Sequence, residues 1–91
     1  MEFIKLKSNK GEIIEGLIQI SPDVYTDERG YFLESWNENN LNKFLGREIK
    51  FTQDNVSKSK KNVIRGLHYQ IEPNPQSKLI RCLSGSIFDV A

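Results

Sequence analysis

The sequence has little of several features that would reveal its class directly. It contains one cysteine, Cys82, so no disulfide can form within the chain and a disulfide-stapled secreted fold is excluded. No apolar run approaches the roughly 20 residues of a membrane-spanning helix, and the opening Met1–Lys7 is broken by charge where a signal peptide would be apolar. We therefore expect a cytoplasmic protein without membrane association, in which Cys82 is a small buried apolar side chain.

The sequence also lacks an excess of either charge and a set of metal ligands. Lys and Arg total 13 against 12 Asp and Glu, which does not suggest a nucleic-acid-binding surface. One histidine and one cysteine are too few for the usual zinc site, and the glycines do not have the spacing of a phosphate-binding loop. We expect no bound metal and no nucleic acid partner.

What is present fits one small folded domain. The 91 residues are 37% apolar and 10% aromatic, which is enough for a single core but not for two. Glu12–Ile20 is rich in β-prone residues and is followed by the turn residues of Ser21–Asp23, so it predicts a strand. The polar turn Asp27–Gly30 between Val24 and the aromatic stretch Tyr31–Trp36 predicts a β-hairpin.

Between Asn37 and Gly46 the pattern changes from strand to helix. Leu41, Phe44 and Leu45 lie at i, i+3 and i+4, asparagines are available for the N-cap, and Gly46 can end the helix. After it the β signal returns, and further strands are predicted over Ile49–Asn55, Val63–Gln70, Leu79–Leu83 and Ser86–Val90.

Short strands with a single brief helix favour an all-β antiparallel sandwich or barrel over a parallel α/β sheet. The lysine-rich segment Lys58–Lys61 is interpreted as a solvated loop. Because Phe88–Ala91 stops within a strand pattern, we expect the sheet to be incomplete, with an edge that a further segment or a second copy would cover.

His68 is the only histidine and the natural starting point for acid–base chemistry, since imidazole ordinarily titrates near neutral pH. In a regular strand, Arg65 and His68 would point to opposite faces. A bulge at Gly66 would turn both side chains into one cavity; alternatively, Arg65 points to solvent and Gly66 only relieves a close contact. The residues alone leave both readings open, as well as a purely structural role for His68.

Other polar residues could line the same cavity. Lys78 opens a predicted strand, and Gln53 and Asn55 share one face of another. Arg and Lys donate to phosphate, whereas amides both donate and accept, so the set suits an anionic, hydroxyl-rich ligand. Each of these side chains taken alone would be an ordinary exposed polar residue.

Several separate motifs resemble one family, the dTDP-4-dehydrorhamnose 3,5-epimerases, which have a cupin-type jelly-roll fold. The similar segments follow in the family's order over nearly the whole chain after Gly16: Gly16–Leu17 with Ile20 and Pro22, Asp27–Glu34, Phe51–Asn55, Ile64–Gln70, Pro75–Arg81 and Gly85–Ala91. The resemblance implies that residues 1–91 are the N-terminal part of a single cupin-like epimerase domain.

The resemblance also implies a mechanism and a set of site residues. His68 would remove a proton from the carbon beside the sugar ketone, and Lys78 would stabilise the resulting oxyanion. Reprotonation from the opposite face would invert C3 and then C5 of dTDP-4-keto-6-deoxyglucose, without metal or cofactor, in dTDP-L-rhamnose biosynthesis. Arg65 would lie near the sugar and diphosphate, and the thymidine diphosphate portion would be bound by Arg29, Glu34, Gln53 and Asn55, with the N-terminal segment reaching toward a partner in a homodimer.

The chain departs from the family pattern in two respects. Val56 stands where many relatives have histidine, and the family's proton-donating tyrosine and its histidine-orienting aspartate belong to a C-terminal half outside these 91 residues. Two alternatives to the 3,5-epimerase therefore stay open. One is an enzyme that inverts only C3 or only C5, and the other is a truncated, non-catalytic module that binds sugar nucleotides or serves in assembly.

Overall fold

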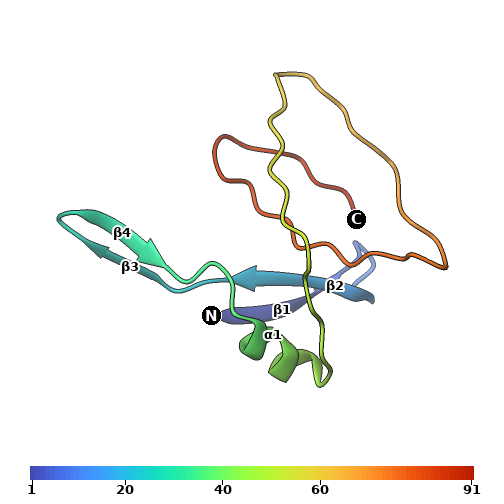
Figure 1. The fold of residues 1–91 in the computed structure, drawn as a ribbon, viewed down its shortest axis with the longest axis horizontal. Helices are drawn as coiled ribbons and strands as arrows, with labels where there is room; N and C mark the ends of the chain where they lie inside the picture. The colour runs from blue at the N-terminus through green and yellow to red at the C-terminus, as the bar shows by residue number, and fades with distance from the viewer. The chain divides into compact units, whose positions relative to one another are not determined.

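A computed structural model describes all 91 residues, which divide into two compact units, Met1–Asp54 and Asn55–Ala91. The first unit holds all the regular elements, in the order β1, β2, β3, β4, α1 (Figure 1). Four strands in two small antiparallel sheets and one short helix agree with the expected all-β composition. No helix of the chain has the length and apolar character needed to cross a membrane.

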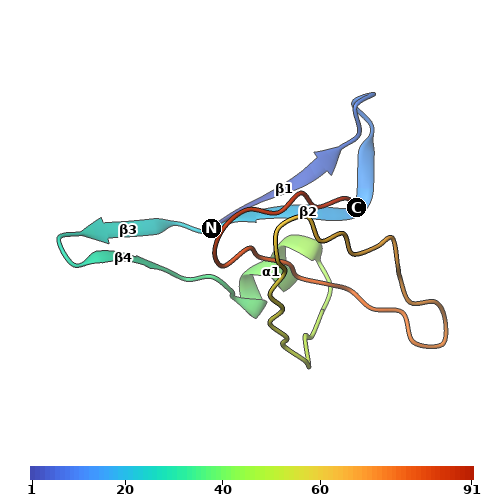
Figure 2. The ribbon, with the colours of Figure 1, turned by 90° about the horizontal axis from the view of Figure 1, so that it is seen from above.

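The strands β1 (Glu2–Lys7) and β2 (Ile13–Ser21) form an antiparallel pair and lie side by side in Figures 1 and 2. Their register runs from Glu2 opposite Ser21 to Lys5 opposite Ile18, and it shifts before Lys7. β2 confirms the strand predicted over Glu12–Ile20. β1 is not among the predicted strands, although Ile4 and Leu6 alternate with Lys5 and Lys7 as in a half-exposed strand.

The strands β3 (Val24–Asp27) and β4 (Gly30–Leu33) form the predicted hairpin. Asp27 pairs with Gly30, so Glu28 and Arg29 make a two-residue connection. Within the first unit this hairpin extends away from β1, β2 and α1 (Figure 2). The second strand ends at Leu33 and does not continue to Trp36 as predicted, since its partner β3 begins only at Val24.

Helix α1 (Glu38–Leu45) confirms the predicted helix and its capping residues. The Asn37 side chain accepts a hydrogen bond of 3.0 Å from the Asn40 amide, which satisfies one of the free N–H groups of the first turn. Gly46 adopts φ 67°, a left-handed conformation that favours glycine, and its amide donates to the Asn42 carbonyl at 2.9 Å. Both ends of the helix are therefore set by neighbouring residues.

Few side chains pack together in the first unit, and two of them join α1 to β1. Leu41 is the only buried residue of the chain, and the rings of Phe3 and Phe44 stack with centroids 5.1 Å apart. Trp36 and Phe51 meet edge to face at 5.2 Å. The expectation of a substantial core is wrong for this structure, because two-stranded sheets and one helix offer few layers to face each other.

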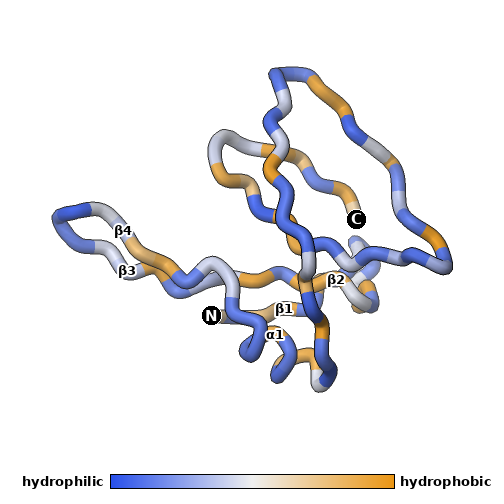
Figure 3. Tube along the Cα trace, in the orientation of Figure 1, coloured by the Kyte–Doolittle hydropathy of each residue, from blue (hydrophilic) through white to orange (hydrophobic).

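The four strands predicted after the helix, from Ile49 to Val90, are absent from the structure. Residues 52–91 are exposed and contain only turns and irregular backbone, although apolar residues recur along them (Figure 3). A strand requires a partner for its backbone N–H and C=O groups, and no ladder forms here. The strand-based readings of Gln53 and Asn55, and of a bulge at Gly66, therefore do not apply. Cys82 is exposed and not buried as expected.

Candidate functional site

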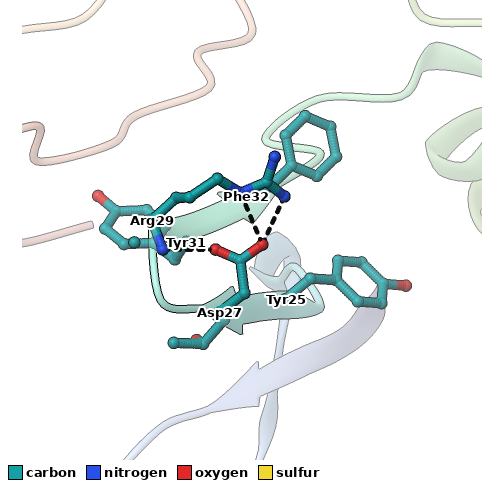
Figure 4. A pocket seen from close by; sticks show the side chains of 7 residues that line it. Tyr25, Asp27, Arg29, Tyr31 and Phe32 are labelled. Carbon is teal, nitrogen blue, oxygen red and sulfur yellow. Dashed lines mark hydrogen bonds and ion pairs between the residues drawn. The ribbon is translucent and has the colours of Figure 1, made fainter.

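The turn of the β3–β4 hairpin holds the best-defined polar arrangement of the chain. The Asp27 carboxylate accepts three hydrogen bonds from Arg29: one at 2.8 Å from the backbone amide, one at 3.1 Å from Nε and one at 2.5 Å from Nη2 (Figure 4). The guanidinium of Arg29, followed by the bond from its amide, lowers the pKa of Asp27 below its usual range. The ion pair is exposed, with 84% of the Arg29 side chain accessible.

Around this ion pair lies an open hollow of about 420 Å³. It is lined by hairpin residues only, namely Tyr25, Thr26, Asp27, Arg29, Gly30, Tyr31 and Phe32 (Figure 4). Tyr25 and Phe32 are direct cross-strand partners and therefore lie on the same face of the hairpin. All three aromatic rings are largely exposed. A guanidinium beside exposed aromatic rings can bind an anion joined to a flat ring system.

Glu34 follows β4 and is tied to the start of the helix. Its Oε1 accepts a hydrogen bond of 3.1 Å from Nδ2 of Asn37, the N-cap residue of α1. Asn37 thus links Glu34 to α1, since its own carboxamide oxygen caps the helix. The exposed Glu34 carboxylate keeps further acceptor capacity for hydroxyl or N–H donors of a ligand.

The remaining residues predicted for the site fall near or beyond the division between the two units. Gln53 belongs to the end of the first unit, and Asn55 opens the second, which also contains Arg65, His68 and Lys78. All five side chains are exposed. The structure thus places Arg29, Glu34 and Gln53 in one unit and the other four predicted site residues in the other.

Arg65 is held by the segment that precedes it. Its Nε donates to Ser59 Oγ at 3.0 Å, and its Nη2 donates to the Lys58 carbonyl at 3.3 Å. The chain reverses between them at Asn62, which has φ 68°, and the Val63 amide donates to the Lys60 carbonyl at 3.4 Å. This turn also confirms that Lys58–Lys61 is a solvated loop. Together the lysines and Arg65 form a cationic segment suited to phosphate.

His68 and Lys78, the predicted catalytic pair, are exposed residues of the second unit. Gly66 precedes His68 with φ 126°, which side chains rarely adopt, and a methyl group added at Gly66 would lie 4.0 Å from His68 Nδ1. A side chain at position 66 would therefore be in ordinary van der Waals contact with the imidazole. An exposed imidazole and an ammonium group can respectively accept a proton and stabilise an oxyanion.

Sequence reasoning missed the role of Asp27, which it interpreted only as part of a polar turn. The available signal was an aspartate two residues before Arg29, because an Asp side chain commonly accepts the amide two positions on. It also missed Tyr25, Tyr31 and Phe32 as lining residues, which the alternation of a hairpin could have indicated.

Comparison with known proteins gives a consistent result. The profile of the dTDP-4-dehydrorhamnose 3,5-epimerase family matches residues 12–91. A dTDP-4-dehydrorhamnose 3,5-epimerase from Shigella flexneri is 54% identical over 82 residues, which cover 90% of this chain and 45% of that protein. One from Salmonella typhimurium is 51% identical over 78 residues, covering 86% and 43% respectively.

A less similar relative is named as a 3-epimerase and not as a 3,5-epimerase. A dTDP-4-dehydrorhamnose 3-epimerase from Streptomyces niveus is 36% identical over 77 residues, which cover 85% of this chain and 37% of that protein. The chain thus spans less than half the length of these curated relatives, and no solved structure gives a significant match. The match over residues 12–91 includes every predicted site residue, and on this basis the chain belongs to the dTDP-4-dehydrorhamnose 3,5-epimerase family.

Proposed function

We propose that the chain is the N-terminal part of a dTDP-4-dehydrorhamnose 3,5-epimerase that acts on dTDP-4-keto-6-deoxyglucose in dTDP-L-rhamnose biosynthesis. The observation that carries the proposal is the family match over residues 12–91, supported by about 50% identity to curated 3,5-epimerases. The proposed setting is a cytoplasmic homodimer with a cupin-type jelly-roll fold, working without metal or cofactor.

The proposed chemistry begins with proton transfer to His68. A C–H bond beside a ketone is acidic, because the electron pair left on carbon delocalises onto the carbonyl oxygen. His68 would take the proton, and the ammonium group of Lys78 would stabilise the enolate oxygen. A proton delivered to the opposite face of the same carbon would then regenerate the ketone with inverted configuration. The resemblance assigns that donor to a tyrosine beyond residue 91.

The nucleotide portion would be anchored away from the reacting carbons. Arg29 and Arg65 supply guanidinium groups for the diphosphate, and each is already held by a neighbour, Asp27 or Ser59. Glu34, Gln53 and Asn55 would complete the site for thymidine diphosphate. Binding energy from these remote contacts would orient the sugar at His68.

Proton exchange at the sugar tests the proposal. The chain is incubated with dTDP-4-keto-6-deoxyglucose in D₂O, and the C3 and C5 protons are followed by NMR. Loss of both signals supports the 3,5-epimerase. Nucleotide binding without exchange at either carbon would contradict proton removal by His68 in this chain and favour the non-catalytic sugar-nucleotide module.

A second candidate is an epimerase that inverts a single carbon. The 36% identity to a 3-epimerase favours this reading, since the proton-abstracting base and the ketone would be common to both enzymes. Exchange at C3 alone, with the C5 signal retained, would support the narrower activity.

A further inference from the structure

The Asp27 carboxylate contacts Arg29 in two distinct ways. Oδ1 accepts the Arg29 amide at 2.8 Å, which builds the hairpin connection, while Oδ2 accepts both Nε and Nη2. The same side chain therefore shapes the turn and fixes the direction of the guanidinium (Figure 4). The other carboxylate of this connection, Glu28, makes no ion pair with Arg29.

The contact between Asp27 and one edge of the Arg29 guanidinium determines which N–H groups remain for a ligand. Arg carries five N–H groups in a planar fork, and Asp27 takes the Nε–H and one N–H of Nη2. Both N–H groups of Nη1 and the second of Nη2 remain. These lie at the end of the fork, where two parallel N–H groups suit two oxygens of a phosphate.

We propose that Asp27 is a positioning residue for Arg29, holding its guanidinium by the Nε–Nη2 edge so that the Nη1 end is presented to the nucleotide diphosphate. This inference rests on the proposed function, in which Arg29 binds that diphosphate. The Arg29 side chain is otherwise 84% exposed, and an unanchored arginine would lose rotamer freedom on binding. Because Asp27 already holds the Arg29 side chain in the free protein, less rotamer freedom is lost on binding.

A carboxylate beside an anion site also repels the anion. The direction in which the affinity changes when Asp27 is neutralised therefore tests the proposal. If Asp27 only added negative charge, its neutralisation would strengthen diphosphate binding. If it positions Arg29, its neutralisation weakens binding. Glu28 provides the matched control, because Glu28→Gln removes a charge from the same connection without touching the contact to Arg29.

The test measures dTDP affinity by isothermal titration calorimetry on the full chain and on single variants. Arg29→Gln should weaken dTDP binding, as the proposed function requires. Asp27→Asn should weaken it by about 3- to 10-fold, the range expected when one side chain must be immobilised on binding. Glu28→Gln should leave the affinity unchanged or raise it. Adding Asp27→Asn to Arg29→Gln should cause no further loss, since Asp27 acts through Arg29.

The outcomes separate the inference from the proposed function. Unchanged or tighter binding by Asp27→Asn, with Arg29→Gln still weakened, overturns the positioning role and leaves the nucleotide site in place. Equal affinity of wild type and Arg29→Gln overturns the assignment of Arg29 itself.

The Asp27→Asn variant retains an oxygen for the Arg29 amide, so the turn is expected to persist. The Arg29 Nε–H resonance gives a second measurement in the absence of ligand. It should be shifted and slow to exchange in wild type but not in Asp27→Asn, and identical Nε–H behaviour in the two proteins would overturn the proposal.

Discussion

The two units of this chain contain similar kinds of residue but differ in what those residues build. Large apolar side chains are exposed in both, from Ile4 in the first to Phe88 in the second. Only Met1–Asp54 forms strands and a helix, because its elements lie close in sequence and supply one another with hydrogen-bond partners. Asn55–Ala91 shows that β-prone residues do not make a strand without a partner.

The same contrast extends to the proposed site. Two of the residues proposed for nucleotide binding in the first unit are held by neighbours, Arg29 by Asp27 and Glu34 by Asn37. The proposed catalytic residues His68 and Lys78 belong to the unit without regular structure. We therefore expect substitutions of Arg29 or Leu41 in the first unit to alter binding or stability, and substitutions of His68 or Lys78 in the second to alter chemistry.

The largest expected effect follows from removing the proposed base. His68→Asn should slow proton exchange at the sugar by a factor of about 10² to 10⁴, because the amide cannot accept the proton. Its dTDP affinity should stay close to wild type. Deuterium incorporation followed by NMR measures the rate, and calorimetry measures the affinity.

Arg29→Gln serves as the control from the first unit. It should lower the affinity for dTDP while leaving exchange at saturating sugar nucleotide largely intact. Undiminished exchange in His68→Asn would remove that residue from the mechanism. It would also contradict the assignment of proton removal to the second unit.

A matched pair of leucines tests the contrast in packing. Leu41→Ala should destabilise the first unit by about 2 kcal/mol, the low end for a buried leucine, because few neighbours surround it. Leu79→Ala, at a 44% exposed position of the second unit, should change the free energy of unfolding by no more than about 0.5 kcal/mol. Urea unfolding followed by circular dichroism compares them. Equal losses would mean that both leucines are packed in solution.

A pair of glycines tests the contrast in backbone. Gly46→Ala should cost about 1 kcal/mol, since alanine is strained at φ 67° at the end of α1. Gly66→Ala, at φ 126°, should instead move the NMR signals of the neighbouring His68 without altering the stability of the helix. Unmoved His68 signals would contradict the placement of the imidazole beside position 66.

The smallest effect concerns pH and the Asp27–Arg29 pair. Because Arg29 lowers the pKa of Asp27 in the folded chain, the pair contributes stability above the ordinary aspartate pKa. That contribution is lost as pH falls through the lowered value. An NMR titration should show the Asp27 midpoint rising in Arg29→Gln, and the shift should shrink at high salt. An Asp27 midpoint unaffected by Arg29→Gln would contradict the ion pair in solution.

The elements predicted correctly are those set by local sequence. The helix between Asn37 and Gly46 is predictable with its caps, because a capping side chain and a left-handed glycine act within one turn. The hairpin around Asp27–Gly30 is predictable for the same reason. The predictions miss β1, and they fail for the second unit because its β-prone segments find no strand partner.

For the candidate site, the sequence supplied the residues but not their contacts. The motifs around Arg29 and His68 gave the family resemblance, and the family match over residues 12–91 bears that resemblance out. The sequence offered a signal for the bond from the Arg29 amide to Asp27, but not for the bonds of the Arg29 guanidinium or for the bond from Arg65 to Ser59, because these depend on how a turn directs two side chains. Their part in catalysis and binding stays a prediction.

The sequence by itself determined the family, the capped helix and the turn of the β3–β4 hairpin, since these depend on residue identity over short spans. Only the tertiary structure decided that Leu41 alone is buried, that β1 pairs with β2, and that one edge of the Arg29 guanidinium is occupied. Burial, strand pairing and side-chain direction depend on the path of the chain in space, which residue identity over short spans does not give.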